Sequence, residues 1–78
     1  MTPEQLASLA MSLRDNEAFQ LALDKQRAAA LDRLATIPRS DEQGFYSAQA
    51  RVAVIDEIRA DLEQFIRSGS PKSPPGLA

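Results

Sequence analysis

Apolar residues recur at helical spacing along most of this chain. Thr2, Pro3 and Gln5 have the features of a helix start, because threonine caps, proline suits the first helical position and glutamine completes a capping box. Leucines then follow at spacings of three and four residues, which predicts a short amphipathic helix over about residues 3–14. The leucine stripe consists of Leu6, Leu9 and Leu13.

A second stretch of helical periodicity runs over about residues 16–37. Asp15-Asn16-Glu17 interrupts the leucine stripe, and either Asp15 or Asn16 could cap a new helix. One unbroken helix with a polar patch is the alternative. Pro38 ends the stretch, because the residue before a proline is displaced from the α region. The apolar side of this helix consists of Phe19, Leu23, Ala30, Leu34 and Ile37.

A third helix is predicted over about residues 41–67, and it would be roughly 40 Å long. Ser40-Asp41-Glu42-Gln43 has the pattern of a second capping box. Gly44 is explained either by close crossing of the earlier helices or by fraying at the helix start. The apolar residues alternate at spacings of three and four, as in a packed seam. They are Ala48, Val52, Ile55, Ile58, Leu62, Phe65 and Ile66.

These elements predict an all-α fold in one domain over residues 1–67. We expect an antiparallel helical hairpin of two long helices with a short N-terminal helix. Gly69 is a plausible C-terminal stop, and residues 68–78, rich in Pro, Ser and Gly, are expected to form an extended or disordered tail. This tail contains Pro71-x-x-Pro74, a minimal polyproline-recognition pattern, but the pattern is common by chance and an ordinary flexible terminus is the favoured interpretation.

The helical stripes also predict where contacts form. Some apolar residues lie off the stripes, and these either form a partner surface or are covered by the short N-terminal helix. They are Leu21, Leu31, Tyr46 and Val54. The predicted packing seam or partner-binding surface consists of Phe19, Leu23, Leu34, Ile55, Ile58, Leu62 and Phe65.

Composition narrows the chemistry. The chain of 78 residues has no histidine, cysteine or tryptophan, which excludes disulfides, Cys/His zinc sites and thiol nucleophiles. Asp56, Glu57 and Asp61 are the best candidate carboxylates, but they point away from the apolar stripe and should be solvated. Arg59 and Glu63, four residues apart, should pair on the helix surface. We therefore expect no catalytic residues, no metal, no cofactor and no small-molecule substrate.

Size and charge bear on partners. So short a chain without disulfides or metal is typically stabilised by helix packing and association. The net charge of −2 does not favour nucleic acid, whose binders usually carry a basic surplus. No apolar run approaches the ~20 residues needed to span a bilayer, and the first residues lack the features of a signal peptide. The default expectation is therefore a soluble intracellular protein.

The arrangement resembles a known group of proteins. Leu13-Arg14-Asp15-Asn16-Glu17-Ala18-Phe19 opens a long helix after a short leucine helix, and a polar turn leads to a final helix with Gly44 and Val54-Ile55-Asp56-Glu57-Ile58. Over most of residues 4–67 this resembles small helical proteins encoded among the head and portal genes of tailed bacteriophages. The resemblance implies a virion or assembly component that works by contact, located in the virion or in the cytoplasm of the host cell. It implies no particular functional residues.

Three functions follow as hypotheses. The first is a non-enzymatic structural or adaptor protein that binds a protein partner, or forms a homo-oligomer, through its helices. The second is a small regulatory protein, such as an inhibitor or anti-repressor, that docks on a host protein. The third, less favoured, is a helix-turn-helix DNA-binding protein in which Arg33, Arg39 and Arg51 contact phosphate.

Overall fold

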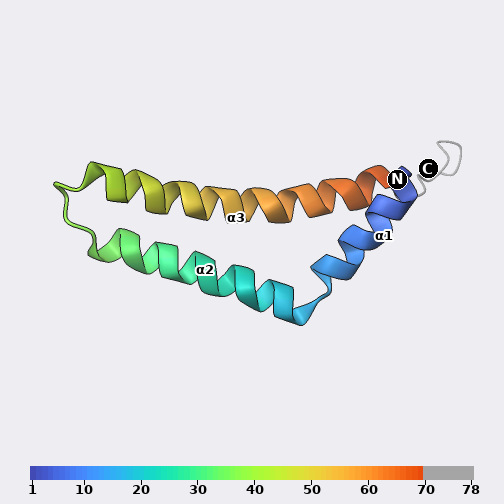
Figure 1. The fold of residues 1–78 in the computed structure, drawn as a ribbon, viewed down its shortest axis with the longest axis horizontal. Helices are drawn as coiled ribbons and strands as arrows, with labels where there is room; N and C mark the ends of the chain where they lie inside the picture. Colours follow the sequence, from blue (N-terminus) through green and yellow to red (C-terminus); the bar gives the residue numbers. More distant parts are fainter. Residues whose placement is uncertain (70–78) are drawn as a thin grey trace, which may run out of the picture.

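The structure, a computed structural model, describes residues 1–69, which form three α-helices and no strand (Figure 1). Helix α1 spans Pro3–Arg14, α2 spans Glu17–Thr36 and α3 spans Glu42–Gly69. The predicted all-α fold class is confirmed. The predicted ranges 16–37 and 41–67 differ from the observed α2 and α3 by one or two residues at each end.

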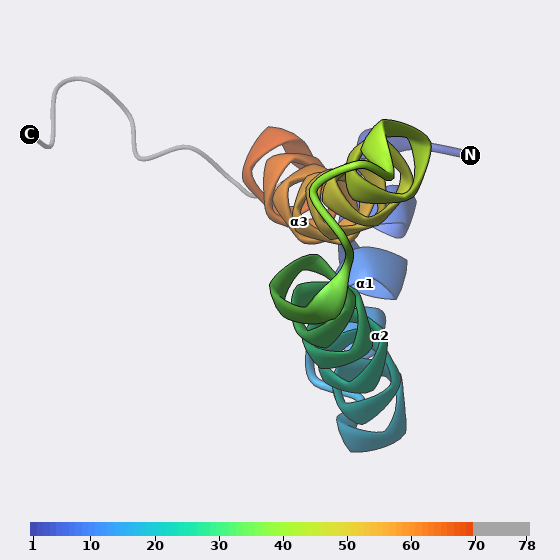
Figure 2. The same cartoon turned by 90° about the vertical axis from the view of Figure 1, so that its left-hand side faces the viewer.

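The three helices form a hairpin with one bent arm. Helix α2 runs antiparallel to α3, and α1 runs from the C-terminal end of α3 to the start of α2 (Figure 1). The second view shows α1 crossing from the level of α3 to the level of α2 (Figure 2). Helix α3 packs against both α1 and α2, whereas α1 and α2 make few contacts with each other. One arm is therefore α3, and the other is α1 followed by α2.

Side-chain caps explain where α1 begins and where the arm bends. The Thr2 hydroxyl accepts a hydrogen bond from the Gln5 N–H at 3.1 Å, and the Gln5 side chain accepts one from the Thr2 N–H at 2.8 Å, which confirms the predicted capping box. The Asn16 side chain accepts a hydrogen bond from the Phe19 N–H at 2.8 Å and so caps α2. Of the two alternatives at Asp15-Asn16-Glu17, the structure has the broken helix.

The start of α3 differs from the prediction. Asp41, not Ser40, is the cap, because its carboxylate accepts a hydrogen bond from the Gly44 N–H at 2.9 Å. Gly44 is then the third helical residue and has no side chain to complete a capping box. A Cβ atom at Gly44 would collide with the Ile37 side chain and would come within 2.5 Å of the Asp41 carboxylate. The Ile37 side chain, which follows α2, and the Asp41 cap therefore leave little room for a side chain at position 44.

The core is narrow and rich in alanine. Helix α1 packs through Ala7 and Ala10, while Leu9 and Leu13 are exposed and Leu6 is half-buried; the predicted leucine stripe is therefore not the packed face of α1. Alanine allows the backbones of two helices to approach more closely than leucine does. The buried residues are Ala7, Ala10, Leu23, Ala30, Ala48, Ile55, Leu62 and Ile66.

Gly69 accounts for the close approach of α1. It is the last residue of α3, as the predicted stop requires, and it has no positive φ. A Cβ atom here would collide with the backbone oxygen of Pro3 and would lie 2.5 Å from the Ala7 Cβ. The predicted tail begins two residues too early, and its remainder, including Pro71-x-x-Pro74, lies outside the described residues.

Candidate protein-contact surfaces

The predicted seam residues differ in burial. Those buried between the arms are Leu23, Ile55 and Leu62, and those half-buried are Phe19 and Leu34. Leu62 joins Ala10 and Ile66 in one buried cluster, against which Phe19 packs. Ile58 and Phe65 are each 36% exposed. Each follows a buried residue by three positions, which turns it about 60° toward the side of α3.

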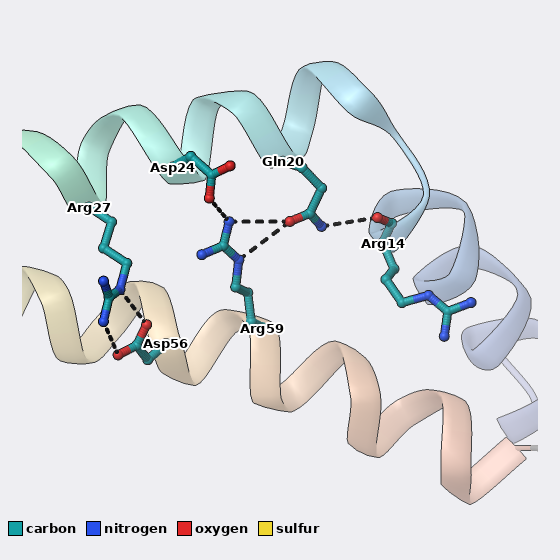
Figure 3. A network of polar contacts seen from close by, with 6 residues as sticks. All are labelled: Arg14, Gln20, Asp24, Arg27, Asp56 and Arg59. Carbon is teal, nitrogen blue, oxygen red and sulfur yellow. Dashed lines mark hydrogen bonds and ion pairs between the residues drawn. The ribbon is translucent and has the colours of Figure 1, made fainter.

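One flank of α3 carries ion pairs to α2 (Figure 3). Arg27 of α2 donates two hydrogen bonds to the Asp56 carboxylate, at 2.9 and 3.4 Å. Arg59 of α3 donates to the Asp24 carboxylate and to the Gln20 side-chain oxygen. Each helix thus contributes both an acid and a base, so these contacts fix the register of the two arms.

The same polar flank reaches the bend between α1 and α2. The Gln20 side-chain amide donates a hydrogen bond to the Arg14 carbonyl oxygen at 3.0 Å (Figure 3). That carbonyl is at the C-terminal end of α1, where no following helical turn can satisfy it. Arg14 also lies 3.8 Å from the Glu63 carboxylate of α3. The bend, α2 and α3 are therefore linked through polar side chains.

The ion pairs change the properties of groups that the sequence predicted to be solvated. The hydrogen bond from Arg27 lowers the pKa of Asp56 below its usual value of 3.8, and the same bond raises the pKa of Arg27. Arg59 pairs with Asp24 rather than with the predicted Glu63. The missed signal was the antiparallel register: the residue numbers of Arg27–Asp56 and of Asp24–Arg59 add to the same value, as facing antiparallel helices require.

The opposite flank of α3 carries exposed apolar side chains. Val54, Ile58 and Phe65, here called the outer stripe, are separated by four and seven residues and therefore lie along one line of the helix. Val54 is 51% exposed. Asp56 and Arg59 are on the other side of the buried line that contains Ile55 and Leu62. Helix α3 therefore has a buried line between a polar flank and an apolar flank.

A shallow hollow lies at the turn between α2 and α3. Its volume is about 410 Å³, and the Phe45 and Tyr46 rings meet edge to face with centroids 5.8 Å apart. Apolar side chains form most of its lining, with Arg39 and Glu42 as charged members. This turn-end hollow is lined by Leu34, Ala35, Ile37, Pro38, Arg39, Glu42, Phe45 and Tyr46.

The apolar residues predicted to lie off the stripes are all on the surface. Leu21 is 68% exposed and Tyr46 is 64% exposed, and Leu31 and Val54 are exposed as well. Helix α1 lies along the C-terminal part of α3 and does not cover them (Figure 1). The interpretation that the N-terminal helix hides these side chains was therefore wrong.

The described residues offer little material for other kinds of site. Within residues 1–69, no polar or charged side chain is buried and no group of acidic residues is placed to hold a metal ion. In the same part of the chain, no helix combines the length and the apolar character that crossing a membrane requires. Comparison with protein-family models, curated proteins and solved structures found no match to this chain.

Proposed function

We propose that this chain is a non-enzymatic structural or adaptor protein that acts by helix-mediated contact with protein partners. The setting that we favour, on the resemblance described above, is the particle or the assembly pathway of a tailed bacteriophage. The hairpin serves as a scaffold that holds apolar side chains at fixed positions on its surface.

One observation carries this proposal: the described residues expose more large apolar side chains than they bury. Eleven large apolar side chains are exposed, whereas the buried ones are Leu23, Ile55, Leu62 and Ile66. Clusters of exposed apolar side chains are typical of surfaces that bind other proteins. The turn-end hollow adds concave shape to such a surface, because it has room for an apolar side chain of a partner beside Phe45 and Tyr46.

The electrostatic and chemical properties of the described residues agree with a contact role. The absence of histidine and cysteine from the chain removes the commonest general base and the thiol nucleophile. No carboxylate within residues 1–69 is buried, so none has the enclosed surroundings that a general acid or base usually requires.

The proposal is tested by quantifying the protein in purified phage particles by mass spectrometry. We expect many copies per particle. Tyr46→Ala should reduce the copy number without unfolding the protein, because this side chain is mostly exposed. Glu57→Ala, an exposed position on the same helix and away from the hollow, is the matched control and should be incorporated normally.

Two outcomes would contradict the proposal. The protein could be absent from particles while binding a host protein tightly, which would favour the alternative of a small regulator. It could also turn over a small molecule, which would exclude a purely structural role. If Tyr46→Ala and the parent were incorporated equally, the turn-end hollow would not be part of the contact surface.

A further inference from the structure

We propose that the outer stripe binds the same stripe of a second copy of this chain, with the two α3 helices antiparallel. This inference rests on the proposed function and names one of its partners. It uses a surface distinct from the turn-end hollow. It also explains why the apolar flank of α3 is left open beside a narrow core.

The spacing of residues on this flank continues beyond the three apolar members. Arg51 precedes Val54 by three residues, and Asp61 follows Ile58 by three and precedes Phe65 by four. Alternation of threes and fours is the spacing of a coiled-coil seam. Arg51, Val54, Ile58, Asp61 and Phe65 are all exposed. Helix α3 therefore carries a second seam, about a quarter turn from the buried line that packs on α2.

This second seam is complementary to itself when one copy is reversed. Arg51 lies as far before position 56 as Asp61 lies after it, and Val54 and Ile58 are also equidistant from that position. A two-fold axis at this level places Arg51 opposite Asp61 of the second copy, twice, and packs Val54 against Ile58 between the two ion pairs. A closed two-fold dimer requires such matching of a surface with itself.

The charges on the seam have no partners within the hairpin. Neither the Arg51 side chain nor the Asp61 side chain makes a hydrogen bond or ion pair with residues 1–69, in contrast to Arg27, Asp56 and Arg59 on the polar flank. Arg51 instead lines a small hollow with Arg33, so two positive side chains lie there without an acid. Asp61 of a second copy would supply the missing negative charge.

Sedimentation equilibrium of the purified full chain over a concentration series tests this proposal. We expect the parent to form dimers reversibly. R51D and D61R each place like charges opposite each other at both ends of the seam, so each should weaken dimerisation about tenfold or more. The double variant R51D/D61R restores both ion pairs in exchanged form and should recover the parental dimer. Glu57→Arg is the matched control, because it changes a charge on α3 outside the seam and should dimerise like the parent.

Mixing the two single variants gives the sharpest readout. In a mixed dimer both positions pair an acid with a base, so R51D and D61R should bind each other while neither binds itself. Far-UV circular dichroism should show the same helix content for all variants, because these side chains are exposed and unpaired.

Several results would overturn the proposal. A parent that stays monomeric at all concentrations would do so, as would single variants that dimerise like the parent or a double variant that remains monomeric. A mixture of single variants that shows no heterodimer would exclude the antiparallel pairing. Because the phage-particle assay does not measure self-association, a monomeric parent that is still found in particles would refute this inference alone.

Discussion

Replacing Leu62 by alanine tests whether the two arms are held together by the buried line of α3. Leu62 is buried at the point where α3 meets Ala10 and where Phe19 packs. Leucine-to-alanine changes in protein cores destabilise by about 2–5 kcal/mol. The loss here should be near the lower limit, about 2–3 kcal/mol, because a narrow hairpin can close around a small void. A chain of this size has a total stability of about 4–10 kcal/mol.

The assay is thermal unfolding followed by circular dichroism at one fixed, low protein concentration. A loss of about 2–3 kcal/mol should lower the Tm by about 8–24 °C, at the usual 4–8 °C per kcal/mol for small domains. Leu21→Ala is the matched control, since it makes the same chemical change on a side chain that is mostly exposed. Its effect should stay within about 0.5 kcal/mol.

Equal shifts of the Tm in the two variants would refute the burial argument. Leu62→Asp extends the test, because a carboxylate without a partner is strongly disfavoured in an apolar site. That variant should fail to fold, and folding like the parent would show that Leu62 does not lie between the arms.

Two further predictions concern the end of α3 and the polar flank. Gly69→Ala should destabilise the protein by about 1–3 kcal/mol, because the new Cβ collides with the backbone of Pro3 and with the Ala7 side chain. This effect should outweigh the higher helix propensity of alanine. Urea unfolding measures the change, and a variant more stable than the parent would contradict the prediction. The lowered pKa of Asp56 beside Arg27 means that the unfolded chain binds more protons at acid pH. The pair therefore stabilises the fold above the unfolded pKa of about 3.8, and its contribution disappears as the pH falls through the folded pKa. Asp56→Asn should be less stable than the parent at neutral pH and should approach it below about pH 4; a difference that is the same at both pH values would exclude the ion pair as the cause.

The helices could be predicted from the sequence because capping residues and proline act on neighbours within a few residues. Thr2, Asn16 and Pro38 each determine a helix end through neighbours within a few residues, so their effects can be read from the chain alone. Asp41 shows the limit of this reasoning. Ser40 and Asp41 are both good caps, and the choice between them depends on how Ile37 and Gly44 meet at the turn.

The packed face of α1 could not be predicted from hydrophobicity. Leu9 and Leu13 are more apolar than Ala7 and Ala10, yet the alanines are the buried residues. The deciding factor is the close approach of the α1 and α3 backbones, which the missing side chain of Gly69 permits beside Pro3 and Ala7. Similarly, Arg59 has an acid four residues away in the sequence, but its partner Asp24 is supplied by the hairpin register. Both outcomes depend on contacts between residues that are distant in the chain.

The bend at Asp15 and Asn16 has a consequence for how the protein opens. Helix α1 is joined to α2 by these two residues and packs on α3 mainly through small side chains. Its detachment would break the contacts of Ala10 with Leu62 and Ile66 and the contact between Arg14 and Glu63, while the ion pairs between α2 and α3 remain intact. Such a detachment would expose Leu62 and Ile66 to solvent, next to the already exposed Phe65. Helix α1 therefore limits the exposed apolar surface of α3, because it covers Leu62 and Ile66 and leaves Phe65 exposed.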